Sequence, residues 1–276
     1  MLNDGNTEFS SFLKQIHIQL DSEDFIKIKF EDFLEFLPNI EKTDVLDKDS
    51  ISYISDYLHK ELLESEPKIN RGFVERHVES PIYLFKNTGP FDHTAIRYKQ
   101  GLLMVRMAVI MAFADGSVSE DELLTIKEVI WDMDWLSSME KRSLFAKANY
   151  LITPGLAIDE RTATYNKISL NREILVKKVS ELSQKSASFI IQVAQDVAIA
   201  DGFLDKGEIS LLQDIYRVLE MSVRSVQGDL TRHAAKKHLY VTSGSVKNRN
   251  EDLIPETEMG EIEDVLGDLL LDFDEF

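Results

Sequence analysis

A stretch of twenty residues occurs twice in this sequence. Residues 103–122, LMVRMAVIMAFADGSVSEDE, align without gaps with residues 189–208, FIIQVAQDVAIADGFLDKGE, at an offset of 86 residues. In both copies an apolar helical pattern ends in Ala-Asp-Gly, and a glutamate follows seven positions after the aspartate. A repeated helix and turn predicts two related helical hairpins that pack together as a pseudo-symmetric bundle.

The sequence around the repeat is also helical in pattern. One apolar stripe has spacings of three and four residues: Leu102, Val105, Val109, Ala112 and Phe113. Pro154 is the single proline between Ala95 and Tyr240. Further helices are predicted at about residues 120–134, 138–151, 159–182, 187–200, 206–220 and 222–239. These patterns predict an all-α bundle of six to eight helices over residues 95–240.

The N-terminal residues 1–94 have a different pattern. Helical spacing is present at residues 7–20, 31–37 and 50–64, whereas residues 25–30 alternate as a strand would. Residues 65–93 contain three prolines and two glycines, which is typical of an irregular connector, with a short strand at residues 82–85. The sequence therefore predicts a separate N-terminal module of mixed or helical structure.

The C-terminal end is acidic. A polar linker is expected at residues 241–256, and residues 257–276 repeat apolar side chains at helical spacing. Residues 251–276 hold eleven acidic and no basic residues. An acidic amphipathic helix of this length needs a surface to pack on. Residues 257–276 are therefore expected either to dock on the bundle or to bind a protein partner, and the acidic N-terminal module is a second expected contact for partners.

Composition excludes several functions. The chain has 276 residues and no cysteine, which excludes disulfides and thiolate metal sites. A formal charge of −18 argues against sequence-independent binding of nucleic acid, since that binding depends on cationic side chains. No export signal and no apolar run of membrane-spanning length is visible. A cytoplasmic protein is expected, which would reach the inner membrane only through partners.

The repeated turn resembles half of a calcium-binding EF-hand loop. With Gly116 or Gly202 at loop position 6, the glutamate falls at position 12, as in that loop. Positions 1 and 3 would be apolar, so a standard EF-hand is disfavoured. A divalent cation, calcium, magnesium or manganese, can still be held by the oxygen ligands that remain, which are Asp115, Glu122, Asp201, Asp205 and Glu208.

A structural explanation covers most of the same residues. Ser119 with Glu122, and Asp205 with Glu208, each fit a capping box at a helix start. Asp-Gly is an ordinary turn dipeptide. Capping does not explain why an aspartate stands before the glycine twice, at a helix end where the dipole disfavours negative charge. Structural and metal-binding roles both stay open on these residues.

The doubled Ala-Asp-Gly turn within about 140 helical residues resembles the tellurite-resistance TerB family. The resemblance covers about residues 95–240. It implies a compact α-helical domain, without enzymatic activity, that serves as an adaptor or scaffold in stress-response or phage-defence complexes. It also implies acidic metal ligands at the turns, which map to Asp115, Glu122, Asp201 and Glu208, with Asp205 added. Ser119 stands where the family has an acid.

One alternative function and one further surface remain to be considered. A metal-dependent hydrolase could use the same carboxylates, but it would need convergent ligands and a base near an open coordination position. Residues 224–240 carry a group of basic side chains, Arg224, Arg232, Lys236 and Lys237. These cations either complement a helix C-terminus or dock an acidic surface, for which the chain's own acidic tail is one candidate. Nucleic acid is a further candidate, without support from interleaved aromatic residues.

Overall fold

The computed structural model describes residues 4–37, 40, 46–69, 81–90, 92–153 and 171–243. All of these described residues belong to one compact unit. The predicted tail at residues 257–276, most of the predicted linker and part of the predicted helix at 159–182 lie outside the described residues. Within the described part, no helix is both long and apolar enough to cross a membrane.

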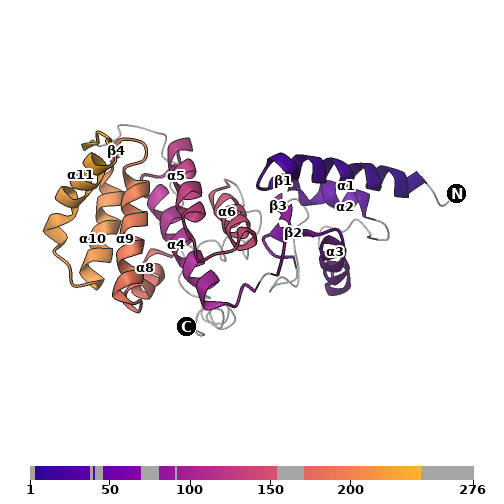
Figure 1. Ribbon diagram of the computed structural model, residues 1–276, viewed down its shortest axis with the longest axis horizontal. Coiled ribbons are helices and arrows are strands. Elements are labelled where there is room, and N and C mark those ends of the chain that lie inside the picture. Colours follow the sequence, from indigo (N-terminus) through magenta and orange to yellow (C-terminus); the bar gives the residue numbers. More distant parts are fainter. Residues whose placement is uncertain are drawn as a thin grey trace, which may run out of the picture. The chain divides into compact units, whose positions relative to one another are not determined.

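The N-terminal module combines three helices with a small sheet (Figure 1). Its elements in chain order are α1 (Asp4–Ser22), β1 (Ile26–Lys29), α2 (Phe30–Phe36), α3 (Lys48–Lys60), β2 (Leu63–Glu66) and β3 (Pro81–Lys86). The strands are antiparallel in the order β1-β3-β2, with Ile26 opposite Leu84 and Ser65 also opposite Leu84. The expectation of mixed structure is confirmed.

Along the chain this module runs helix, strand, two helices and two strands. Helix α3 lies between α2 and β2 in this order. Its exposed charged side chains here are of both signs, two lysines and two aspartates, Lys48, Asp49, Asp56 and Lys60. The order of the elements does not by itself indicate a function. Helix α3 also lacks the row of cationic side chains that phosphate binding needs.

One predicted boundary in this module is wrong. The helix predicted over residues 50–64 ends at Lys60, and Leu62 adopts a left-handed φ of 55°. Leu63–Glu66 then pairs with β3 as a strand. The apolar spacing of Leu58 and Leu62 suggested a longer helix, but pairing with a distant strand overrides local propensity.

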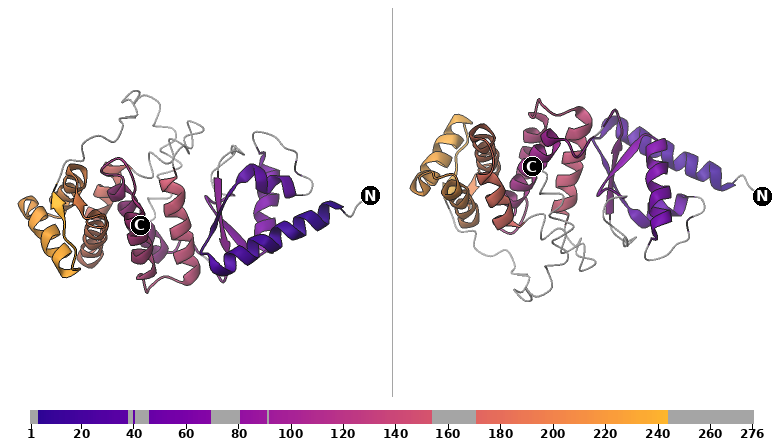
Figure 2. Two further views of the ribbon diagram at one scale, coloured as in Figure 1. Left: turned by 90° about the horizontal axis from the view of Figure 1, so that it is seen from above. Right: turned by 90° about the horizontal axis from the view of Figure 1, so that it is seen from below.

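Strand β3 is buried on both sides. Ile82 and Leu84 pack into the core beneath the helices α1, α2 and α3, whereas Tyr83 and Phe85 belong to the core of the helical domain. Because alternate side chains of a strand point to opposite faces, β3 separates two hydrophobic cores. Figure 2 shows the sheet between α6 (Ser138–Ile152) and the N-terminal helices.

The helical domain is an all-α bundle, as predicted. Besides α6, its described α-helices are α4 (Ile96–Ala112), α5 (Glu120–Trp131), α8 (Arg172–Ser180), α9 (Gln184–Ala198), α10 (Lys206–Val218) and α11 (Val226–Lys236), and a 3₁₀ turn precedes α11 at Val223–Ser225. Helices α4 and α9 pack against each other at the centre. A two-residue strand β4 (Phe203–Leu204) pairs in parallel with β5 (Thr242–Ser243), so the predicted linker starts with an ordered pairing.

The repeat is larger than the sequence comparison indicated. The offset of 86 residues places α4 on α9, α5 on α10 and α6 on α11. Among the described helices, each repeat therefore contributes three and not only a hairpin. Helix α6 packs on α4 and α5, and α11 packs on α9 and α10. The bundle is pseudo-symmetric about the central α4–α9 pair.

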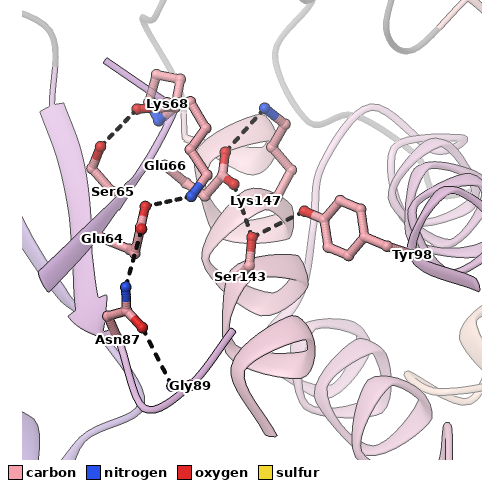
Figure 3. A network of polar contacts seen from close by, with 10 residues as sticks. Glu64, Ser65, Glu66, Lys68, Asn87, Gly89, Tyr98, Ser143 and Lys147 are labelled. Carbon is pink, nitrogen blue, oxygen red and sulfur yellow. Dashed lines mark hydrogen bonds and ion pairs between the residues drawn. The ribbon is translucent and has the colours of Figure 1, made fainter. Parts of the chain in front are cut away.

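A buried polar network joins the sheet to the helical domain (Figure 3). Glu66 of β2 is 2% exposed, and its Oε1 accepts a hydrogen bond from Ser143 Oγ at 2.9 Å. Its Oε2 lies 3.1 Å from Nζ of Lys147, which is one turn further along α6. Tyr98 of α4 shares a 2.9 Å hydrogen bond with Ser143, and burial raises the pKa of Tyr98 above its usual range. The network links three elements across the interface.

Candidate cation site at the paired turns

The first turn follows helix α4. Gly116 has a φ of +95°, which a residue with a side chain would adopt only with strain. Asp115 Oδ1 accepts a hydrogen bond from the backbone N–H of Ser117 at 2.9 Å. This is an Asx turn, in which the aspartate side chain replaces a backbone acceptor. The aspartate that capping left unexplained thus has a structural use.

Helix α5 starts with a capping box. The Ser119 hydroxyl accepts from the N–H of Glu122 at 3.2 Å, and Glu122 Oε2 accepts from the N–H of Ser119 at 2.7 Å. Glu122 is only 4% exposed. The capping interpretation of these two residues is confirmed.

The second turn repeats the first with one change. Gly202 has a φ of +80°, and Asp201 Oδ1 accepts from the N–H of Phe203 at 2.8 Å. Asp205 replaces the serine cap and accepts from the N–H of Gly207 at 2.6 Å, while Glu208 Oε2 accepts from the N–H of Asp205 at 2.7 Å. Two related sequences therefore build two related Asx turns and two capping boxes.

The fold brings the two turns together, although they are 86 residues apart. A Cβ placed on Gly207 at the start of α10 would lie 1.9 Å from the carbonyl oxygen of Ala114 in the first turn. The turn after α4 therefore lies directly against the first turn of α10. The counterpart of Gly207 in the first repeat is Asp121, which has a side chain. The close approach of a turn to the start of the following repeat's helix therefore depends on the glycine of the second repeat.

The carboxylates of both turns influence one another. Burial raises the pKa of Glu122 to about 7, and the charges of Asp115 and Asp201 add to the rise. Burial also raises the pKa of Glu208 to about 8, with further contributions from Asp201, Glu122 and Asp115. In both groups the hydrogen bonds of the capping box oppose the rise. Four predicted site residues thus lie within electrostatic range of one another.

The donor chemistry suits a hard divalent cation, but the ligand geometry is incomplete. Oxygen ligands from carboxylates are what calcium, magnesium and manganese prefer. Each of the five predicted residues already accepts a backbone N–H through one oxygen. Among the residues that the structure describes, no three acidic or histidine side chains are close enough to hold one metal ion. A cation would therefore require the side chains to turn toward one another.

The apolar positions of the loops cannot supply the missing ligands. At positions 1 and 3 of the EF-hand comparison, Met111, Val197 and Ile199 are fully buried in the core, and Phe113 is about one third exposed. The expectation that these side chains cannot donate oxygens agrees with their packing. The site differs from an EF-hand because its first half is the end of a core helix.

Sequence reasoning missed two features, one beside the turns and one at the interface with the N-terminal sheet. A shallow pocket of about 270 Å³ lies beside the turns, lined by Ile110, Phe113, Ala114, Arg172, Gly207 and Leu211. Arg172 donates to Asp214 and Ser210 across this region. The network around Glu66 was also missed. A serine and a lysine at i and i+4 on α6 were its only sequence signal, and that spacing is common.

Comparison with known families agrees with this geometry. Residues 101–228 match the family model described as "Tellurite resistance protein TerB". This part of the chain is TerB-like. The matched residues begin within α4 and end within α11, so they include both turns and all five predicted ligands. Searches of curated proteins and of solved structures gave no significant match.

Proposed function

We propose that this chain is a non-enzymatic adaptor whose TerB-like domain binds a divalent cation at the paired turns. The observation that carries the cation proposal is the mutual electrostatic effect of four carboxylates from two distant segments. The pKa of buried Glu122 is raised to about 7 and that of buried Glu208 to about 8. The protein therefore stabilises the negative charge of these two carboxylates poorly. A divalent cation would relieve that repulsion and favour the ionised carboxylates.

The proposed ligands are the residues named from the sequence. Asp115 and Glu122 would come from the first turn, and Asp201 and Glu208 from the second. Asp205 adds a carboxylate where the first repeat has Ser119. The second carboxylate oxygen of each glutamate is the group that could turn toward the ion, since Oε2 is used in the capping box. Bound calcium, magnesium or manganese would neutralise charge and hold the two repeats together.

Calorimetric titration with each cation tests this proposal. The informative variant is Asp201→Asn/Glu208→Gln, because both amides keep an oxygen that can accept the backbone hydrogen bonds of the turn and cap. The native protein is expected to show saturable heat with at least one cation, and the variant at least a tenfold loss of affinity. Binding should weaken as the pH falls below 7, because protons compete for the glutamates.

The matched control is Asp47→Asn. Asp47 caps α3 by accepting from the N–H of Ser50 at 2.8 Å, so the variant removes one charge from a helix cap in the N-terminal module. Its cation affinity should equal that of the native protein. Absence of saturable heat in the native protein, together with no cation-dependent rise in melting temperature, would remove the metal from the proposal.

The adaptor role concerns protein partners. We assign it to the cytoplasm, in a stress-response complex like those of tellurite resistance or in a phage-defence complex, with the inner membrane reached only through partners. The family match supports the stress-response setting, and the acidic residues 257–276 and the N-terminal module are the proposed contacts. A pull-down that compares the full chain with residues 1–250 tests the role of the C-terminal segment. Identical partner sets would exclude that segment.

The alternative of a metal-dependent hydrolase has no observation in its favour. In the described residues each candidate carboxylate accepts a backbone N–H within a turn or a helix cap, which is a structural use.

A further inference from the structure

The third helices of the two repeats, α6 and α11, occupy equivalent places but have different surroundings. Helix α6 is covered on its outer side by strands β2 and β3 of the N-terminal module. Helix α11 has no such cover within residues 171–243 or the other described ranges. Figure 1 shows α6 and α11 on opposite sides of the α4–α9 pair. The comparison of these two helices therefore identifies the outer side of α11 as a surface without cover among the described residues.

Residue equivalence separates the inner face of each helix from its outer face. Leu144 and Ala148 of α6 are buried, and so are their counterparts Leu230 and Ala234 in α11. These positions face the bundle in both repeats. The inner face of the third helix is therefore the same in the two copies.

The outer positions differ in burial. In α6, Phe145, Ala146 and Lys147 are buried, and the helix packs against β2 and β3 of the N-terminal module. Their counterparts in α11 are Thr231, Arg232 and His233, of which the first two are exposed and the third is partly exposed. The face of α11 that corresponds to a docking face in the first repeat is thus open and polar.

The open face is cationic. Arg224, Arg232, Lys236 and Lys237 lie on it or at its ends, and all four are exposed. Arg232 pairs with Asp229, and Lys237 pairs with Asp196 at 2.5 Å. No ion pair of Arg224 or Lys236 is present among the described residues.

Exposed apolar side chains flank these cations in the sequence. Tyr240, just after α11, is 96% exposed, Leu239 is 41% exposed and Met221 is 41% exposed. Tyrosine and arginine are the residues that most often anchor protein interfaces. The combination of cations and exposed apolar groups fits an acidic surface that also presents apolar side chains.

We infer that the outer face of α11 together with the segments at its two ends, comprising Arg224, Arg232, Lys236, Leu239 and Tyr240, docks an acidic amphipathic segment of a partner protein. In the first repeat a carboxylate from another element meets the third helix, since Glu66 of β2 contacts Lys147 of α6. The counterpart of Lys147 in α11 is His233, which is paired with Asp196. The cations left for a partner are therefore Arg224 and Lys236. In the second repeat the carboxylates would come from the partner. The face is polar, so the complex is expected to be transient and sensitive to salt.

Fluorescence anisotropy with a labelled acidic amphipathic peptide tests this inference on the full chain. The peptide should carry aspartate, glutamate and leucine at helical spacing. Arg224→Gln/Lys236→Gln is expected to lower its affinity at least fivefold, and Tyr240→Ala should lower it further. The matched control is Lys177→Gln/Lys185→Gln, which removes the same charge from exposed lysines of α8 and α9 and should bind as the native protein does.

Three results would overturn the inference. Equal affinity of the α11 variant and its control would show that only overall charge matters. Tighter binding of a DNA duplex than of the peptide, lost in the α11 variant, would assign the face to nucleic acid. A large gain in peptide affinity on removal of residues 251–276 would assign the face to the chain's own acidic segment. None of these results depends on the turn carboxylates, so the proposed cation site stands or falls separately.

Discussion

Lys147 and Glu66 form a buried ion pair of 3.1 Å between helix α6 and strand β2. Their side chains are 10% and 3% exposed, so neither charge has ready access to water. Two charges in such a place stabilise the fold only while both are present, because each compensates the desolvation of the other. The pair fixes how the sheet lies on the helical domain.

Removal of one charge from this pair is therefore expected to be costly. Glu66→Gln should lower the free energy of unfolding by about 3–5 kcal/mol, since the ammonium of Lys147 stays buried without its counter-charge. Urea denaturation measures this loss. Glu66→Gln/Lys147→Met should cost less than the sum of the two single variants. Glu31→Gln, which removes the exposed Lys29–Glu31 pair, is the control and should change stability by less than about 1 kcal/mol.

Gly207 is expected to tolerate no side chain. In Gly207→Ala the new methyl group would lie 1.9 Å from the Ala114 carbonyl, which is backbone and cannot rotate away. We expect a loss of about 2 kcal/mol or more in thermal or chemical unfolding. Gly228→Ala in α11 is the matched control, since nothing lies within 4 Å of its added Cβ. It should leave stability unchanged or raise it by up to about 1 kcal/mol.

Stability should fall as the pH rises through the neutral range. The pKa of a glutamate in the unfolded chain is near 4.5, whereas folding raises that of Glu122 to about 7 and that of Glu208 to about 8. Between these values the folded state binds more protons than the unfolded state, so the free energy of unfolding decreases with pH. The decrease should start near pH 4.5 and end near pH 8. Without added metal, Glu208→Gln should flatten this decrease, and parallel curves for native and variant would contradict the assignment.

The aspartate of the second turn should be replaceable by asparagine but not by alanine. Asp201→Asn keeps an Oδ1 that can accept from the N–H of Phe203, so the Asx turn is retained. Asp201→Ala leaves that N–H without its acceptor and should cost about 1 kcal/mol more than Asp201→Asn. Thermal unfolding of the two variants at one pH gives the difference. A more stable alanine variant would mean that the turn does not depend on the side chain.

The helical domain could be predicted from the sequence because its signals are local. The apolar stripe of α4, the capping boxes and the two Asp-Gly turns each depend on neighbours within a few residues. The repeat then related two such segments and led to the TerB resemblance. Even the two strands β1 and β3 were indicated by short apolar patterns.

The proximity of the two turns could not be predicted in the same way. Gly207 meets Ala114 only because α4 and α9 pack side by side, which is a tertiary arrangement with no local signature. The burial of Glu66 and Lys147 has the same origin, since a glutamate in a connector and a lysine on a helix are usually exposed. The predicted end of the helix at residue 64 failed for a related reason, as the strand partner of Leu63 lies in β3.

Strand β3 serves two hydrophobic cores at once, with Ile82 and Leu84 on one side and Tyr83 and Phe85 on the other. Withdrawal of this strand would open both cores in one event. A protease that gains access to β3, or a force applied to the N-terminal module, would therefore reach the interior of the TerB-like domain as well. The N-terminal module cannot be removed without damage to the helical domain, because β3 contributes side chains to the hydrophobic core of that domain.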